Sequence, residues 1–211
     1  MTQFPREAIL AEASSYYTAK LAQHGATPQG VDWNGELSHH VRHHQFLRLL
    51  APDPAASVLD LGCGYGDFLV FLRQSGHNGQ FIGYDVSSAM IAEAERLHGI
   101  GEDRLWHVGA EPTEPADYAT ASGILNVKGE IPTAEWDAYV RDTMLLLGRS
   151  SRRGFAANML SLSSDPEKRR SNLHYVDPTE MLRFCMQHFG RSVALLQDYG
   201  LYEFTIIVRH T

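Results

Sequence analysis

The chain has 211 residues, of which 44% are hydrophobic and 20% charged, and its formal net charge is −7 at pH 7. This apolar content suffices for one domain with a substantial core, and no run approaches the roughly 20 apolar residues that a membrane-spanning helix needs. The acidic balance argues against a general nucleic-acid binder, which normally carries a basic face, and favours a small-molecule partner.

The first residues, 1–7, show no basic segment followed by an apolar one, so they do not resemble a secretory signal. The two cysteines, Cys63 and Cys185, cannot build a disulfide framework and have no metal-ligand spacing. We therefore expect a cytoplasmic protein whose cysteines are reduced and partly buried.

Two helices are predicted before the first strand. Apolar residues recur at helical spacing over residues 5–24, and Gly25 ends that pattern. A second helix is predicted from 36 to 50, stopping ahead of two prolines. We expect residues 1–50 to form a helical cap that belongs to the same domain as a core at 51–211.

From residue 57 onward, strand and helix patterns alternate. Strands are predicted at 57–61, 80–84, 105–108, 118–124 and 154–160, and helices at 67–74, 87–97, 132–147 and 178–188. The strands are short, mostly apolar runs, as expected of strands buried on both faces of a parallel sheet. Thr133 is the expected N-cap of the helix at 132–147, with Glu135 in its first turn.

The C-terminal part breaks this alternation. Strands are predicted at 192–197 and 202–209, and only residues 198–201 separate them. So short a link can join antiparallel strands but cannot make a parallel crossover. The predicted fold is therefore α/β, with a Rossmann-like, mainly parallel sheet of seven strands and an antiparallel hairpin at or near one edge.

A glycine-rich turn follows the first predicted strand. Gly62, Gly64 and Gly66 would let a ligand approach the backbone closely. A dinucleotide fingerprint requires its third glycine at position 67, where this chain has Asp67, whose carboxylate would repel a pyrophosphate. The pattern disfavours NAD and favours S-adenosylmethionine, which carries no phosphate and has cationic sulfonium and ammonium groups. Asp60, at the strand end, is expected to bind that ammonium directly or through water.

A second acidic residue follows the next predicted strand. Asp85 lies 19 residues after Gly66, close to the separation expected of an acid that binds ribose hydroxyls. Val86 and Met90 would then flank the adenine. A glycine turn followed by an acid in this order indicates S-adenosylmethionine more specifically than either feature alone.

On these residues the chain resembles the class I S-adenosylmethionine-dependent methyltransferases. Residues 58–67 look like motif I of that family, 83–90 look like its acidic-loop motif, and the resemblance covers roughly 36–210. A narrower resemblance is to bacterial small-molecule methyltransferases of undefined substrate. Residues 30–34, 121–128 and 198–204 carry this narrower resemblance.

The resemblance implies further cofactor contacts. Arg42, in the helix before the first strand, corresponds to an arginine that holds the cofactor's carboxylate, for which a planar guanidinium is suited; the alternative is a solvated surface arginine. Many relatives have an aspartate after the third strand that binds the adenine amino group, whereas this chain has Ala110 there. That contact is left to Glu111, to the backbone or to water.

The acceptor is expected beyond the carboxyl ends of the strands. Asn126 and Lys128 could orient it there, with Lys128 either pairing a carboxylate or phosphate of the acceptor or lying in solvent. His174 and Tyr175 are the base candidates by location. Aromatic and polar residues of the cap either contact the substrate or pack the cap onto the sheet: Tyr16, Tyr17, Trp33 and Asn34.

Four histidines crowd the second predicted helix. His39 and His43, and likewise His40 and His44, are i,i+4 pairs that can chelate a metal from one helical face. No carboxylate or cysteine stands at a fitting sequence offset to complete such a site. We therefore expect no metal, and we expect the histidines to be stacked and partly exposed near the cofactor entrance.

The resulting hypothesis is a methyltransferase that acts on N or O of a small molecule. The sequence has no Asn/Asp-Pro-Pro-aromatic tetrapeptide of the kind used on amino groups of bases. The alternative is a catalytically silent S-adenosylmethionine-binding sensor or partner subunit, because cofactor binding and turnover use different residues.

Overall fold

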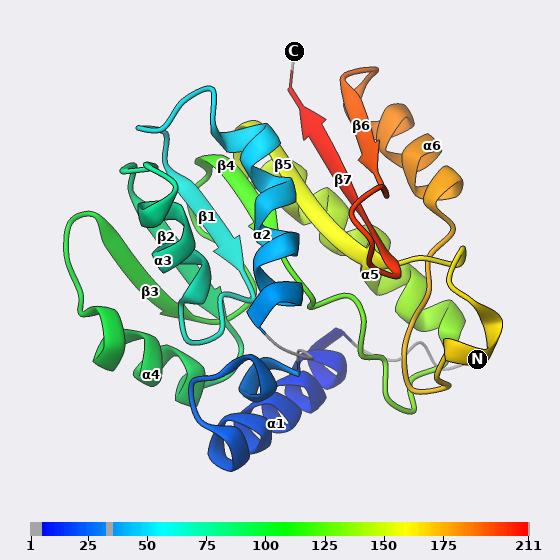
Figure 1. Cartoon of the computed structure of the whole chain (residues 1–211), viewed down its shortest axis with the longest axis horizontal. Helices are drawn as coiled ribbons and strands as arrows, with labels where there is room; N and C mark the ends of the chain where they lie inside the picture. The colour runs from blue at the N-terminus through cyan, green and yellow to red at the C-terminus, as the bar shows by residue number, and fades with distance from the viewer. Residues whose placement is uncertain (1–5, 33–35, 211) are drawn as a thin grey trace.

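The computed structural model describes residues 6–32 and 36–210, so the predicted substrate residues Trp33 and Asn34 lie outside the described residues. The described chain forms one seven-stranded sheet with strand order β3-β2-β1-β4-β5-β7-β6 (Figure 1). The strands are β1 (Val58–Leu61), β2 (Phe81–Asp85), β3 (Arg104–Val108), β4 (Ala116–Ala121), β5 (Ser151–Leu160), β6 (Val193–Leu196) and β7 (Glu203–Arg209).

The sheet has the predicted mixed topology. The first five strands are parallel, whereas β7 is antiparallel to both β5 and β6. The hairpin β6–β7 therefore forms one edge of the sheet, with β6 outermost. This confirms the predicted Rossmann-like architecture.

Helices cover both faces of the sheet. The helices α2 (Glu36–Leu50), α3 (Asp67–Gln74) and α4 (Ser88–His98) pack on one face, and α5 (Thr133–Arg149) and α6 (Pro178–Phe189) on the other (Figure 1). Two 3₁₀ turns, η1 (Pro28–Val31) and η2 (Pro166–Lys168), lie in loops. The remaining helix, α1 (Arg6–His24), crosses the carboxyl ends of the strands. No helix in the described ranges combines the length and hydropathy needed to cross a bilayer.

The central strands are buried on both faces because most of their residues are apolar, whereas β3 at the edge is partly exposed. Val58 of β1 belongs to the core formed with α2 and α3, whereas the next residue, Leu59, belongs to the core formed with α5 and α6. Successive strand residues point to opposite faces, so a run of apolar residues serves both cores.

The structure divides the predicted cap at residues 1–50. Phe46, Leu49 and Leu50 of α2 are fully buried against the sheet, so α2 belongs to the helical layer of the core. Among the described residues of the predicted cap, α1 and η1 are the part that covers the strand ends.

Predicted element boundaries shift at several places, including the start of β5, which is at Ser151 and not at 154. The strand predicted at 118–124 ends at Ala121, because Gly123 takes a left-handed conformation (φ 81°) and its N–H donates to the side chain of Asn158 (2.9 Å). Thr133 is the first residue of α5 and not its cap; Pro132 occupies the cap position, and no side chain caps the helix.

Candidate active site

The glycine turn between β1 and α3 depends on backbone that only glycine adopts easily. Gly62, Gly64 and Gly66 all have positive φ, at 79°, 55° and 86°. A Cβ at Gly62 would also lie 2.0 Å from Cγ2 of Ile124, which belongs to the loop after β4. The turn therefore brings bare backbone beside that loop. Gly62 and Gly64 line the cavity described below, whereas Gly66 shapes the start of α3 without lining it.

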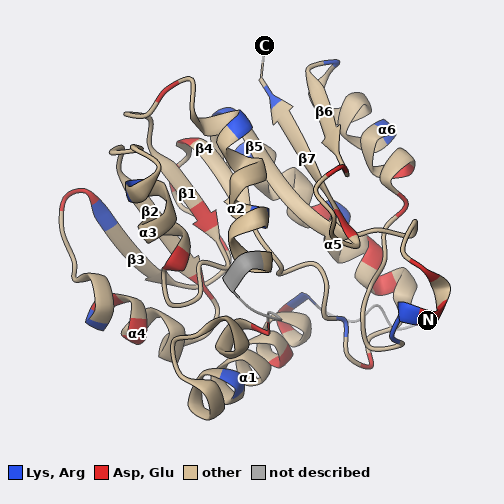
Figure 2. Cartoon of the chain, in the orientation of Figure 1, with Lys and Arg blue, Asp and Glu red and all other residues tan. Residues whose placement is uncertain are grey.

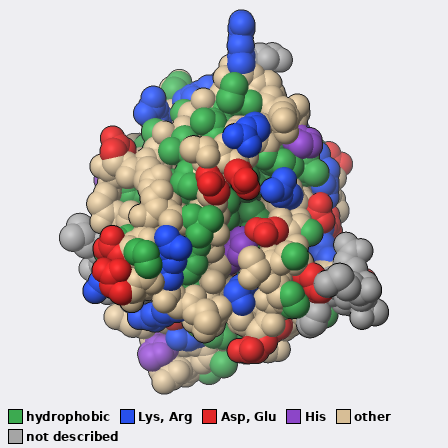
Figure 3. All heavy atoms as spheres, turned by 90° about the vertical axis from the view of Figure 1, so that its right-hand side faces the viewer, with side chains coloured by type: hydrophobic (Ala, Val, Ile, Leu, Met, Phe, Trp, Pro, Cys, Tyr) green, Lys and Arg blue, Asp and Glu red, His purple; other side chains and the backbone are tan. Residues whose placement is uncertain are grey.

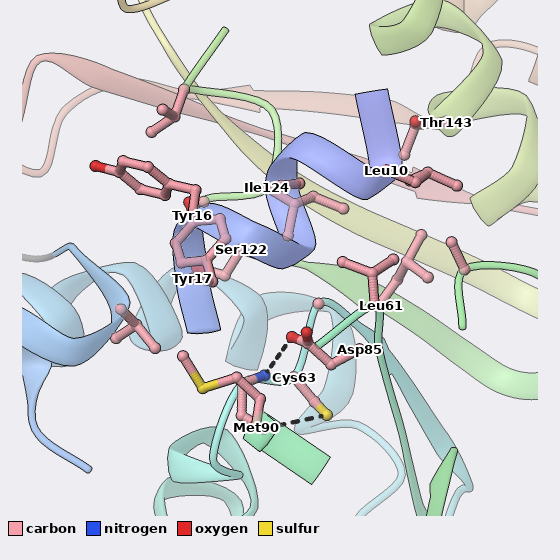
Figure 4. A pocket seen from close by; sticks show the side chains of 18 of the residues that line it. Leu10, Tyr16, Tyr17, Leu61, Cys63, Asp85, Met90, Ser122, Ile124 and Thr143 are labelled. Carbon is pink, nitrogen blue, oxygen red and sulfur yellow. Dashed lines mark hydrogen bonds between the residues drawn. The ribbon is translucent and has the colours of Figure 1, made fainter. Parts of the chain in front are cut away.

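Asp85, at the end of β2, accepts hydrogen bonds from two loops of the site, the glycine turn and the loop after β2. Its Oδ2 accepts a hydrogen bond from the N–H of Gly64 (3.0 Å), and its Oδ1 accepts one from the N–H of Ser87 (2.8 Å). The carboxyl is only 8% exposed, and this burial raises its pKa to about 6, although both hydrogen bonds oppose the shift. Asp85 thus holds the glycine turn while lining the cavity (Figure 4).

Asp60 is a second buried acid beside Asp85. It is 4% exposed and accepts a hydrogen bond from Oγ1 of Thr120 (2.7 Å). Burial and, to a smaller extent, the charge of Asp85 raise the pKa of Asp60 to about 7. A cationic ligand would lower the pKa values of both acids, because its charge stabilises the ionised carboxylates. The acids and the glycine backbone therefore fit the sulfonium and ammonium groups of the expected cofactor.

One cavity connects these acids with α1. Its empty volume is about 1390 Å³, part of it open to solvent. Asp60, Asp85, Val86 and Met90 line one side, together with the backbone of Gly62 and Gly64. Tyr16 and Tyr17 of α1 lie across the cavity from Asp85, Cys63 and Met90 (Figure 4). The cavity is also lined by residues of α1, α2, α3, α5 and the loop after β4: Ile9, Leu10, Glu12, His39, His43, Asp67, Ser122, Ile124, Lys128 and Tyr139.

Hydroxyl groups fasten α1 over the cavity. Oγ of Ser14 donates to the carbonyl of Val86 (3.0 Å), and Oγ1 of Thr18 lies 2.7 Å from Oγ of Ser87. Both contacts join α1 to the loop that follows β2. The helix thus forms the roof of the cavity through a small set of polar contacts.

The loop after β4 forms another wall, and side-chain hydrogen bonds with the neighbouring strand β5 fix it. Asn158 of β5 accepts from the N–H of Gly123 and donates to Oγ of Ser122 (3.0 Å). Asn126 accepts from the N–H of Leu160 through its side chain (3.0 Å). Asn126 is buried in this role and does not line the cavity, so the structure makes it a loop-holding residue and not the predicted acceptor contact.

The two predicted base candidates also lie away from the cavity. Nε2 of His174 is 3.1 Å from Oδ1 of Asp137, and burial lowers the pKa of this histidine. The Tyr175 hydroxyl accepts a hydrogen bond from the N–H of Arg170 (3.0 Å). Neither residue lines the cavity, because the loop before α6 turns its histidine toward α5.

Arg42 has a partner that the sequence did not suggest. Its Nε and one terminal nitrogen donate to the two carboxylate oxygens of Glu203 (2.7 and 2.6 Å), and the other terminal nitrogen donates to the carbonyl of Ser38 (2.7 Å). Both charged groups are buried, and Arg42 does not line the cavity. The structure therefore corrects the predicted contact with the cofactor's carboxylate.

Glu111 is placed outside the cavity as well. It is exposed and forms ion pairs with Arg6 and, at 3.5 Å, with Arg149. The backbone segment Gly109–Ala110 lines the cavity in its place, in line with the backbone alternative for the adenine contact.

Several lining residues escaped the sequence analysis. Ile9 and Leu10 lie on the apolar side of the first predicted helix. Their helical spacing could have predicted that this side of the helix faces the strand ends. Tyr139 reaches the cavity from α5, and no local pattern distinguishes it from a core residue. Lys128 lines the cavity, with its Nζ 3.3 Å from the carbonyls of Gly129 and Ile131, and its contact with an acceptor stays a prediction.

Comparisons with known proteins agree with this architecture. A family model described as "Methyltransferase domain" matches residues 59–148. A protein of Mycobacterium tuberculosis, named "Putative methyltransferase Rv1506c", is 44% identical over 160 residues, which are 75% of this chain and 95% of that protein.

Solved structures share the fold at low sequence identity. Magnesium protoporphyrin IX methyltransferase of Synechocystis PCC 6803, with bound SAH, superposes with a TM-score of 0.66 at 14% identity, covering 98% of this chain and all of the other. The N-methyltransferase NodS of Bradyrhizobium japonicum WM9, in complex with S-adenosyl-L-homocysteine, gives 0.65 at 16% identity, covering 93% and 97%.

Proposed function

The chain belongs to the class I S-adenosylmethionine-dependent methyltransferases, and from this premise we propose that it methylates a nitrogen or oxygen atom of a small-molecule acceptor. Its cofactor is S-adenosylmethionine, which supplies a methyl group already activated on a sulfonium sulfur. The observation that carries the proposal is the continuous cavity from the acids of the glycine turn to the aromatic underside of α1.

The acidic side of the cavity would hold the cofactor. Asp85 has lone pairs left on both carboxylate oxygens after its two backbone hydrogen bonds, so it can accept the ribose hydroxyl protons while keeping the turn in place. Asp60 faces the same space and would attract the cofactor's ammonium group. Val86 and Met90 supply apolar surface for the adenine.

The acceptor would bind between α1 and the loop after β4. Tyr16, Tyr17 and Ile124 offer aromatic and apolar surface for the body of a small molecule. Lys128 adds a cation at the edge of this surface, held only by two long contacts to carbonyl groups. These features favour a flat acceptor that carries a carboxylate or phosphate.

Catalysis by these residues would consist mainly of positioning. The displacement at an activated methyl requires the acceptor atom in line, so a rigid wall and a closed roof contribute more than a strong base. Asn158 keeps the loop after β4 rigid, and α1 excludes water from above. The residues first considered as bases, His174 and Tyr175, are not needed in this scheme.

Surface charge favours a small acceptor over a nucleic acid. Lys and Arg are interspersed with Asp and Glu along the described part of the chain (Figure 2). The side that includes α6 also carries acidic, basic and hydrophobic side chains next to one another (Figure 3). With both cysteines free and buried, a reducing compartment such as the cytoplasm suits the protein.

An S-adenosylhomocysteine release screen tests the acceptor proposal. The purified chain is incubated with S-adenosylmethionine and matched sets of aromatic amines and phenols, with and without a carboxylate or phosphate. We expect turnover with one anionic set, and we expect Lys128→Met to raise KM for that set with little change in kcat. The control is Lys168→Met, in the exposed η2 turn outside the cavity. Transfer only to protein or nucleic acid would contradict the small-molecule proposal.

A further inference from the structure

We propose that His39, His43 and Asp67 form a divalent-cation site at the edge of the cavity. The two histidines lie one turn apart on α2, and Asp67 is the first residue of α3. Their candidate ligand atoms all lie within 4.8 Å of one another. The sequence showed the histidine pair but gave no carboxylate at a fitting offset, because Asp67 reaches the pair only through the packing of α3 against α2.

The spacing of these atoms suits a small cation. Nδ1 of His39 is 3.3 Å from Oδ2 of Asp67, and Nδ1 of His43 is 3.8 Å from the same oxygen. Zinc binds histidine nitrogen and carboxylate oxygen at about 2.0–2.2 Å, so ligand atoms on a tetrahedral edge lie roughly 3.3 Å apart. Side-chain shifts of less than about 1 Å would therefore place all three atoms at bonding distance.

The surroundings bury and orient the histidines. His39 is 6% exposed and His43 2%, so both rings are held by packing between α2 and its neighbours. Nδ1 of His43 is buried and has no hydrogen-bond partner in the described part of the chain, an arrangement that an ion would remedy. The ring of His43 packs between Phe68 (4.7 Å) and Phe71 (5.3 Å), which fixes its direction.

Charges near the site permit a cation. Arg42, on the same helix, is a cation close enough to act on His43, and its charge is matched by the bidentate pair with Glu203. Asp67 supplies a negative charge within the site itself. A divalent ion would thus enter a pocket that is not dominated by uncompensated positive charge.

The position of the site suggests its use. All three residues line the cavity that would hold cofactor and acceptor. Three protein ligands with an open position are typical of sites that bind an exchangeable water or substrate. A cation here would present its open position to the cavity and bind an oxygen atom of a ligand there. This inference rests on the cluster and not on the proposed acceptor.

Calorimetric titration of the chelator-treated full chain with Zn²⁺ tests the site, without S-adenosylmethionine present. We expect one equivalent to bind, with Asp67→Asn weakening the affinity at least about 10-fold, because even residues outside the first coordination shell cost 10–100-fold. The near-isosteric amide keeps the fold, which an unchanged unfolding temperature would verify. The variant His39→Gln/His43→Gln should show a loss at least as large.

The matched control is His40→Gln/His44→Gln, which removes the exposed i,i+4 pair on the same helix. This variant should bind Zn²⁺ like the unaltered chain, and Co²⁺ should give the intense visible absorption of a tetrahedral site in both. Loss of binding in the His40/His44 variant but not in Asp67→Asn would overturn the proposal. Equal Zn²⁺ affinity of all variants, or no binding by the unaltered chain, would overturn it as well.

Discussion

Asp60 and Asp85 show how a single residue's environment prepares it for a cationic ligand. Both carboxyls are buried, and burial is the largest cause of the raised pKa of each. Such acids are partly protonated between pH 5 and 7 unless a positive charge enters the cavity. Cofactor binding should therefore be coupled to loss of protons from these groups.

This coupling predicts a pH dependence of S-adenosylmethionine affinity. The ionised acids attract the cationic cofactor, and their pKa values without cofactor are about 6 and 7, so affinity should rise as pH increases from 5 to 7.5 and then level off. Calorimetric titration at several pH values measures this. Asp60→Asn, which keeps an oxygen for Thr120, should flatten the upper part of the rise.

Asp103→Asn is the control for that experiment, because Asp103 lies outside the cavity and pairs with Arg73. It should reproduce the original pH profile. A pH-independent affinity in the unaltered chain would contradict the assignment of the two acids to the cofactor.

The pair Arg42–Glu203 predicts a loss of stability and not of cofactor contact. Arg42→Met would leave the carboxylate of Glu203, which is only 1% exposed, without its partner, and stranding one member of a buried pair costs about 3–5 kcal/mol of unfolding free energy. Urea denaturation measures this loss. Arg153→Met, which breaks the exposed pair with Asp53, should lower stability far less, because solvent screens that pair. Weaker S-adenosylmethionine binding by Arg42→Met at unchanged stability would restore the cofactor role of Arg42.

At the scale of elements, α1 differs from the helices of the two core layers. It has one fully buried residue, Ile9, whereas α5 buries seven. Its polar contacts to the loop after β2 join it directly to the cofactor side of the cavity. Elements with few buried apolar contacts open most easily, so α1 should open before the sheet does.

Hydrogen exchange can follow this behaviour. Saturating S-adenosylhomocysteine should slow amide exchange in peptides from 6–24, because a ligand under α1 adds contacts to a weakly held helix. Peptides from β7 should exchange slowly with or without ligand, since this strand lies inside the sheet. An unchanged exchange rate for α1 would show that the helix does not respond to an occupied cavity.

At the scale of the whole molecule, the site arises where the two halves of the sheet diverge. β1 pairs with β2 on one side and with β4 on the other, so the loops after these strands separate and leave a space at their carboxyl ends. Ligands of open α/β sheets bind at this switch point. The cover α1 and the loop after β4 wall this space into a cavity that stays partly open to solvent.

The sequence by itself determined the architecture and the edge of the sheet that carries Asp60, Asp85 and the glycine turn. Alternating apolar runs and helical patterns specify a parallel sheet, and the link at 198–201 is too short for anything but an antiparallel pair. The positions of Asp60, Asp85 and the glycines relative to strand ends are local, so chain order alone puts them at one edge.

Only the tertiary structure decided the contacts between residues far apart in the chain. Glu203 lies 161 residues after Arg42 and binds the Arg42 guanidinium away from the cavity. In the same way, Asp137 pairs with His174 away from the cavity. Asp67 meets His39 and His43 because α3 packs beside α2. A buried side chain binds whichever partner the fold brings within about 3 Å, and no local pattern encodes that distance.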